Sequence, residues 1–184
     1  MRRALLPLLL AAALSGCGSG HAPRSAPPSP ATRARSLAGA PPELAALHRQ
    51  AGRLLRGGPR AFRTRLAGLR GHPVVVNKWA SWCGPCRAEF PFFQRLSVEL
   101  GRRVAFVGVD AQDSDADARA FLRRYPVSYP SYVDPDQHVA AVFGATLGFP
   151  TTAFYAAGGK LSYVHQGAYA SEAKLREDIA RYAG

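Results

Sequence analysis

Cysteine, methionine and tryptophan are scarce in this chain, whose 184 residues include three Cys, one Met and two Trp. Three cysteines are too few for the disulfide network of a small coreless domain, and too few for a zinc site of four cysteines. The length fits one ordinary domain, and the 47% apolar and 20% charged residues are typical of globular chains. The 15 Pro and 18 Gly are unevenly placed, which indicates that part of the chain is unstructured.

Acidic residues are also few, with 12 Asp and Glu against 24 Lys and Arg. The imbalance lies in the first 70 residues, because residues 74–184 hold 12 basic and 11 acidic side chains. That later region has neither a basic stripe with interleaved aromatics nor a zinc-finger spacing, so we expect no nucleic-acid partner. The arginine-rich stretch from Arg49 to Arg70 instead favours contact with anionic lipid headgroups.

The apolar run near the N-terminus is too short for a transmembrane helix. Arg2 and Arg3 precede eleven apolar residues at 4–14, whereas a spanning helix needs about 20. This pattern is typical of a signal peptide. The sequence that follows, LSGC, resembles the bacterial lipobox, in which the cysteine, here Cys17, is lipidated. The alternative is an ordinary secretory signal with a chance cysteine.

Three segments follow from this interpretation. Residues 1–17 are expected to be a lipoprotein signal peptide with its lipobox cysteine, and residues 18–42, rich in Pro, Ala and Ser, a disordered tether. Residues 43–184 are expected to fold. We therefore expect a lipid-anchored protein on the extracytoplasmic face of the cell membrane, attached by acyl chains.

Strand and helix patterns alternate along the part that is expected to fold. Helical spacing of apolar residues continues from Leu44 to Leu55, and five further helices are predicted at 62–69, 83–100, 116–124, 135–143 and 171–182. Strands are predicted at 74–79, 104–110, 131–133, 151–155 and 160–165. This order predicts an α/β sandwich with a mixed sheet.

Cys83 and Cys86 form a C-x-x-C pair directly after a predicted strand and at the start of a predicted helix. The N–H groups and the positive dipole end of a first helical turn favour a thiolate over a thiol. We therefore expect Cys83 to be the exposed nucleophile and Cys86, one turn on, to resolve a mixed disulfide. Gly84 and Pro85 close the turn between them, and proline is tolerated there because a first-turn N–H has no helical partner.

From about residue 60 to residue 184, the chain resembles the TlpA-like, membrane-anchored thiol-disulfide oxidoreductases of the thioredoxin fold. The resemblance rests on WASWCGPCRAEFP at 79–91, VGVD at 107–110, GFPTT at 148–152 and Gly167. It implies a thioredoxin-like three-layer sandwich with a mixed β-sheet, an α/β insertion and an N-terminal helical extension.

The two thiols could also be half of a zinc site. Zinc needs four ligands, yet there is no second cysteine pair and the five histidines lie at no ligand spacing to Cys83 and Cys86. We therefore prefer redox chemistry and expect neither a metal nor a cofactor. A copper chaperone that uses both thiols with a histidine such as His165 is a further alternative, since thiolates suit Cu(I).

The resemblance also implies a proton acceptor. Cytosolic thioredoxins carry a buried aspartate six residues before the first cysteine, but here that position is Asn77, which does not titrate. TlpA-like proteins of the cytochrome-c-maturation type instead use an acid three residues after the second cysteine, which here is Glu89. We expect Glu89 to take the proton of Cys86 as a general base. The alternative is a first-turn glutamate that stabilises the helix dipole.

Pro150 matches the family's cis-proline beside the disulfide, and the alternative is a trans proline that merely starts a strand. The resemblance implies that the backbone of Phe149 binds an extended substrate peptide. Trp82 is expected to form a contact surface beside Cys83 rather than part of the core. Lys78 lies in the middle of a predicted strand, where an apolar residue is expected, and the pattern does not explain it.

The function implied is reduction of disulfides in exported proteins, such as apocytochrome c, with electrons from a membrane thiol carrier. The Gly-Pro pair resembles that of the reductase thioredoxin, whose potential is about −270 mV. The nearest alternative is a dithiol oxidase that forms disulfides in secreted proteins. A peroxiredoxin-like peroxidase is disfavoured, because Cys83 lacks the Pro-x-x-x-Thr-x-x-Cys context.

Overall fold

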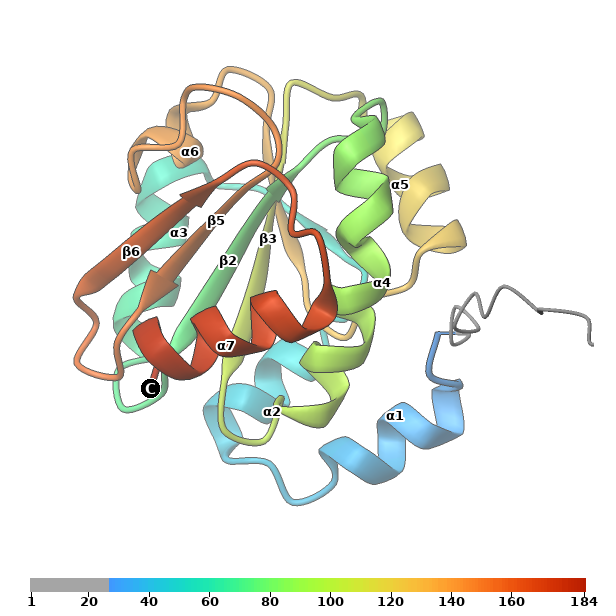
Figure 1. The fold of residues 1–184 in the computed structure, drawn as a ribbon, viewed down its shortest axis with the longest axis vertical. Coiled ribbons are helices and arrows are strands. Elements are labelled where there is room, and N and C mark those ends of the chain that lie inside the picture. The colour runs from blue at the N-terminus through green and yellow to red at the C-terminus, as the bar shows by residue number, and fades with distance from the viewer. Residues whose placement is uncertain (1–26) are drawn as a thin grey trace, which may run out of the picture.

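The structure is a computed structural model, and it describes residues 27–184. Helices and strands alternate along the chain between residues 42 and 155 (Figure 1). The helices are α1 (Pro30–Leu37), α2 (Pro42–His48), α3 (Gly58–Gly68), α4 (Gly84–Glu99), α5 (Asp115–Arg124), α6 (His138–Ala141) and α7 (Glu172–Tyr182). The strands are β1 (Leu54–Leu55), β2 (Val74–Trp79), β3 (Ala105–Ala111), β4 (Ser131–Asp134), β5 (Thr151–Tyr155) and β6 (Leu161–Gln166).

The strands form one mixed sheet in the order β1-β4-β3-β2-β5-β6. Strands β1, β4, β3 and β2 run parallel to one another, whereas β5 runs antiparallel to both of its neighbours, β2 and β6. β2 is central and all six of its residues are buried. The sequence of β2 is therefore mostly apolar, as is typical of strands that are covered on both faces.

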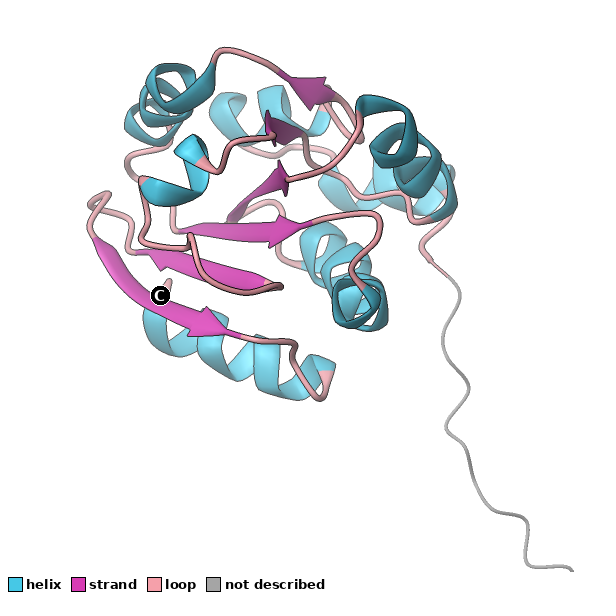
Figure 2. Cartoon of the chain, turned by 90° about the horizontal axis from the view of Figure 1, so that it is seen from above, coloured by secondary structure: helices cyan, strands magenta, loops and turns pink. Residues whose placement is uncertain are grey.

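Helices cover both faces of the sheet, so the molecule has three layers (Figure 2). On one face α4, α5 and α7 pack their apolar side chains against Val75, Trp79 and Phe106. On the other face α2, α3 and α6 pack against Val76 and Val107. Alternate residues of each strand serve the two cores, as the two-residue period of a strand requires.

The predicted helix over 44–55 is wrong in its second half. Helix α2 ends at His48, and Leu54 and Leu55 form strand β1, which pairs in parallel with Ser131 and Tyr132. Gly52, at φ 67°, turns the chain and donates its N–H to the carbonyl of Tyr129. The edge of β4 offers hydrogen-bond partners that sequence periodicity does not reveal, so tertiary pairing overrides the helical pattern.

The predicted tether over 18–42 is also wrong for its last part, because residues 30–37 form α1 and α2 begins at Pro42. The side chain of Ser29 caps α1 by accepting the N–H of Thr32, and Pro30 supplies the first turn. Half-buried Leu37 lies close to Gly101, at the end of α4. A local cap and packing of α1 against α4 thus order a segment whose composition predicts disorder.

Helix α6 is shorter than the predicted 135–143. It begins only at His138 because the preceding residue, Gln137, has a left-handed backbone at φ 58°. No helix within residues 27–184 is both long enough and apolar enough to cross a membrane.

Candidate active site

The cysteine pair lies where β2 passes into α4. β2 ends at Trp79, and Cys83 is the N-cap of the 16-residue helix α4. Cys83 and Cys86 form a disulfide with their Cα atoms 5.3 Å apart, and the main-chain N–H of Cys86 donates to Cys83 Sγ at 3.1 Å. Gly84 and Pro85 form the exposed turn between them. Negative charge that develops on Cys83 is therefore stabilised by the helix terminus.

Cys83 is less accessible than the sequence predicts. Only 3% of its surface is exposed, against 0% for Cys86. Both cysteines belong to the apolar cluster that contains Trp79 and Phe90, and Phe149 packs against that cluster. The prediction of an exposed Cys83 is thus wrong for the disulfide form, because tertiary packing covers a position that chain spacing leaves open.

Glu89 lies one helical turn beyond Cys86 and its side chain is completely buried. Asn77 Nδ2 donates to Oε1 at 3.1 Å, and the main-chain N–H of Tyr169 donates to Oε2 at 2.9 Å. Burial raises the pKa of Glu89 to about 7, although both hydrogen bonds act against the rise. Glu89 therefore changes charge near neutral pH, as a proton acceptor requires. It lies beyond the first turn of α4, which disfavours the helix-dipole alternative.

The peptide bond between Phe149 and Pro150 is cis, as the resemblance implies. Phe149 contacts Trp82 edge to face, with the ring centroids 4.9 Å apart. Trp82 is 55% exposed, and its indole N–H donates to the carbonyl of Gln112 at 2.8 Å. The structure thus places Trp82 at the surface, next to Cys83 in the chain. The contact with Phe149 and the hydrogen bond to Gln112 fix the orientation of its ring.

Lys78, which the sequence pattern does not explain, is completely buried on β2. Its ammonium donates to Gln137 Oε1 at 2.6 Å and to the carbonyl oxygens of Ala145 and Gly148 at 2.7 and 3.1 Å. It also lies 4.0 Å from the ring centroid of Phe149. Burial lowers the pKa of Lys78, and the charge of Asp134 opposes that change. A lysine within an apolar strand is the one sign in the sequence that this position has a special role. The sequence does not reveal its partners, because they lie about 60–70 residues away.

Two aspartates near the cysteine turn were also missed. Asp110, 1% exposed, pairs with Trp79 in the β2–β3 register, and burial, reinforced by the charge of Asp113, raises its pKa to about 8. Asp113 accepts hydrogen bonds from the N–H and hydroxyl of Ser81. Ser81 precedes Trp82, so Asp113 holds the turn that presents the cysteine pair.

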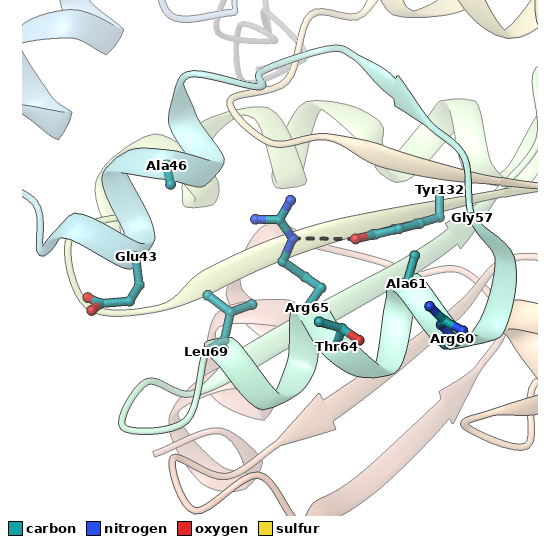
Figure 3. Close-up of a pocket in the computed structure, with 10 residues that line it drawn as sticks. Glu43, Ala46, Gly57, Arg60, Ala61, Thr64, Arg65, Leu69 and Tyr132 are labelled. Carbon is teal, nitrogen blue, oxygen red and sulfur yellow. Dashed lines mark hydrogen bonds between the residues drawn. The ribbon is translucent and has the colours of Figure 1, made fainter.

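A cavity of about 800 Å³ lies elsewhere, between α2, α3 and β4 (Figure 3). Arg65 crosses it, with Nε 3.4 Å from the hydroxyl of Tyr132. Its lining residues include none of the cysteine turn or of the segment before Pro150. A smaller hollow of about 460 Å³ lies between the start of α4 and α5 and is lined by Trp82, Arg87 and Tyr125, among others, but by neither cysteine.

Two further sequence hypotheses concern metal and lipid. Among residues 27–184, no group of three or more His, Cys, Asp and Glu is arranged to hold a metal ion. His165 stacks on Tyr169, with centroids 4.1 Å apart, and its Nδ1 lies 4.0 Å from Asp178. Cys17, the expected lipidation site, lies outside the described residues.

A disulfide at the N-terminus of a helix, a cis-proline directly before a strand, and a mixed sheet between helices together define the class of thioredoxin-fold dithiol proteins. The chain matches the Redoxin family model over residues 54–179 and belongs to this family. The expectation of a thioredoxin-like α/β fold is thereby confirmed.

Known proteins agree with this assignment. The chain is 31% identical to the thioredoxin-like protein YneN of Bacillus subtilis over 57% of its own length and 62% of that protein. It is 32% identical to the thiol-disulfide oxidoreductase ResA of Oceanobacillus iheyensis, over 56% and 54% of the two chains. The aligned region thus spans little more than half of these relatives.

Solved structures of similar proteins share the fold. A thiol:disulfide interchange protein of Chlorobium tepidum superposes with a TM-score of 0.58 at 26% identity, covering 64% of this chain and 84% of that one. A secreted disulfide oxidoreductase of Mycobacterium tuberculosis, homologous to Escherichia coli DsbE, superposes with a TM-score of 0.57 at 26% identity, covering 62% and 85%.

Proposed function

We propose that this protein is a thiol-disulfide oxidoreductase that reduces disulfides of exported proteins through Cys83 and Cys86. The observation that carries the proposal is the disulfide at the start of α4, in which Cys83 Sγ accepts the N–H of Cys86. That N–H can stabilise a thiolate on Cys83 once the disulfide is reduced. The names of the relatives ResA and DsbE support the same chemistry.

The reaction proceeds in two exchanges. In the reduced enzyme, the Cys83 thiolate attacks one sulfur of the partner's disulfide, so that a mixed disulfide forms and the partner's other sulfur leaves as a thiolate. Glu89 then takes the proton of the Cys86 thiol, and the Cys86 thiolate attacks Cys83. The second partner thiolate leaves, the Cys83–Cys86 disulfide forms, and two electrons have passed to the partner.

The surface beside the cysteines supports a protein as the partner. Trp82 is exposed next to the pair, and the adjoining hollow is lined by Arg87 and Tyr125. Phe149, which is joined to Pro150 by a cis peptide bond, contacts the ring of Trp82. We assign Trp82, Phe149 and Pro150 to the binding of an extended substrate segment.

We further propose that the enzyme acts outside the cytoplasm, is anchored by a lipid on Cys17, and receives electrons from a membrane thiol carrier. The signal-like run at 4–14 and the LSGC sequence support this location. Mass spectrometry of the full chain produced in a bacterial host is expected to show acylation that a Cys17→Ser variant lacks. An unacylated wild-type chain would contradict the anchor but not the dithiol chemistry.

Reduction of insulin disulfides by the full chain, purified in detergent, tests the function. Cys83→Ser is expected to lower the rate by at least about 10³-fold, since it removes the nucleophile. Cys86→Ser keeps the nucleophile and is expected to accumulate the mixed disulfide. A mixed disulfide that accumulates in Cys83→Ser and not in Cys86→Ser would refute the assigned roles.

The redox potential tests the direction of electron flow. Equilibration of the dithiol with dithiothreitol or glutathione buffers is expected to give a potential close to that of thioredoxin, about −270 mV. A potential above about −150 mV would overturn the reductase assignment and favour the dithiol oxidase, because DsbA, an oxidant, lies near −120 mV. A role in cytochrome c maturation belongs to the reductase assignment and fails with it.

A further inference from the structure

The ammonium group of Lys78 is buried in the central strand and has a complete set of partners. Lysine is almost never fully buried unless it is paired. Its three hydrogen bonds, to Gln137, Ala145 and Gly148, use all three N–H donors of the ammonium group. The three acceptors therefore favour the charged form of Lys78. An apolar side chain at this position would leave all three without this donor.

Two of these partners belong to the segment that leads into Pro150. The carbonyls of Ala145 and Gly148 stand at the two ends of residues 145–148, so one ammonium group ties both ends together. Lys78 also pairs with Thr151 in the β2–β5 register. It is therefore connected to the chain on both sides of Pro150.

The same ammonium contacts the ring of Phe149, which in turn contacts Trp82. It lies 4.0 Å from the centroid of Phe149, and Phe149 in turn contacts Trp82 at 4.9 Å. A desolvated cation attracts the face of an aromatic ring more strongly than an exposed one does. Lys78 thus acts on Trp82 through a single intermediate ring.

A nearby carboxylate does not account for the position of Lys78. Asp134 is buried, and its two oxygens accept the main-chain N–H groups of Val139 and Ala140 at the start of α6. The hydrogen bonds of Asp134 stabilise the start of α6, whereas two of the three hydrogen bonds that Lys78 donates go to the segment before Pro150. Neither residue donates to or accepts from the other in these bonds. A buried charge also adds little net stability compared with a well-packed apolar side chain.

We propose that Lys78 is a positioning residue that holds residues 145–149, and with them the rings of Phe149 and Trp82, in the shape that binds the protein substrate. The proposal rests on the proposed function. It assigns Lys78 to substrate affinity and not to the reactivity of the two thiols.

Lys78→Met, in the full chain purified in detergent, tests the proposal, because methionine keeps the length and removes all three donors. KM for insulin is expected to rise about tenfold, which corresponds to about 1.4 kcal/mol of lost binding. The rate with Ellman's reagent, a small disulfide that needs no such surface, is expected to stay within about twofold, since the thiols are untouched. Hydrogen exchange at residues 145–149 is expected to become faster.

Gln137→Gly is the matched control. It removes the one Lys78 partner outside the segment, and glycine tolerates the left-handed backbone found at this position. KM for insulin is expected to remain near the wild-type value. If Lys78→Met does not fold, Lys78→Gln, which removes the charge and one of the three donors, is expected to raise KM in the same direction.

Two results would overturn the proposal: an unchanged KM for insulin in folded Lys78→Met, or an equal loss of rate with insulin and with Ellman's reagent. Unchanged hydrogen exchange at residues 145–149 would also contradict it. If the wild-type chain does not reduce insulin, the proposed function fails, and the exchange measurement still decides whether Lys78 orders the segment.

Discussion

At the carboxyl end of β2, neighbouring residues serve opposite faces of the sheet. Asn77 faces the layer of α4 and donates to the buried carboxylate of Glu89. Lys78 faces the other layer and donates to the segment before Pro150. Both charged side chains, Glu89 and Lys78, are fully buried, yet their surroundings differ.

Burial disfavours the charged form of both side chains, so the difference lies in the hydrogen-bond partners that each one has. Glu89 accepts two hydrogen bonds from uncharged donors, and burial prevails, so that its pKa rises to about 7. Lys78 has three acceptors and the nearby negative charge of Asp134. A weakly matched acid can exchange a proton near neutral pH, whereas a cation whose donors are all occupied is suited to hold a structure in place.

Glu89→Gln is expected to have the largest effect on this comparison. Loss of the proton acceptor should slow the step in which Cys86 resolves the mixed disulfide, by about 10²-fold at pH 8. The wild-type rate should rise with pH through an inflection near 7, the pKa of Glu89, and the variant should lack this inflection. Stopped-flow measurement of partner release across pH 5–9 provides the test.

Glu99→Gln is the control for that experiment, because Glu99 lies on the same helix but pairs with Arg176 at the surface. Its profile should match the wild type. An inflection near pH 7 that persists in Glu89→Gln would assign Glu89 to structure alone.

Stability should depend on pH with opposite signs for the two buried charges. Between pH 4.5 and about 7 the folded chain retains the proton of Glu89 while the unfolded chain releases it. The free energy of unfolding therefore falls as pH rises, by up to about 3 kcal/mol. Just below pH 10.5 the unfolded chain binds the proton of Lys78 more tightly than the folded chain, so stability rises with pH.

Urea unfolding at several pH values measures both slopes. Relative to wild type, Glu89→Gln should lose the fall on the acidic side and Lys78→Met the rise on the alkaline side. Asp110, whose pKa is raised to about 8, is present in both variants and cancels in the difference. A fall in stability with rising pH on the alkaline side would contradict the prediction, because it would mean that the folded chain favours the charged form of Lys78 over the neutral one.

Trp82→Ala is expected to have the smallest effect. Loss of the contact with Phe149 and of exposed apolar surface should raise KM for insulin about fivefold, or about 1 kcal/mol. Stability should change little because Trp82 is 55% exposed. Leu161→Ala removes an exposed apolar side chain from β6 and should leave KM unchanged. Similar KM values for the two variants would show that exposed apolar surface near the cysteines is not used for binding.

The sequence allowed the sheet core and the cysteine turn to be predicted, because both depend on short-range patterns. β2 and α4 are found where the apolar run and the C-x-x-C pair place them. Leu54 and Leu55 were misassigned because their strand exists only through pairing with β4. Composition likewise predicted disorder at 30–37, where a cap and the contact of Leu37 produce a helix.

For the candidate site, the resemblance identified Glu89 but not what surrounds it. One of its two donors is the main chain of Tyr169, 80 residues away. Such a contact depends on how the chain returns after β6, and no local pattern contains it. The partners of Lys78 lie 59, 67 and 70 residues away. The sequence pattern therefore does not explain this lysine, and only the folded structure shows which groups it contacts.

The alternation of side chains along β2 has an evolutionary consequence. Because Asn77 and Lys78 are adjacent in the chain but separated by the sheet, mutation can alter proton transfer and substrate range independently, one codon apart. An insertion of one residue in this strand would exchange the two environments and abolish both properties together. Substitutions that keep the length of β2 can therefore change one of the two environments and leave the other as it is.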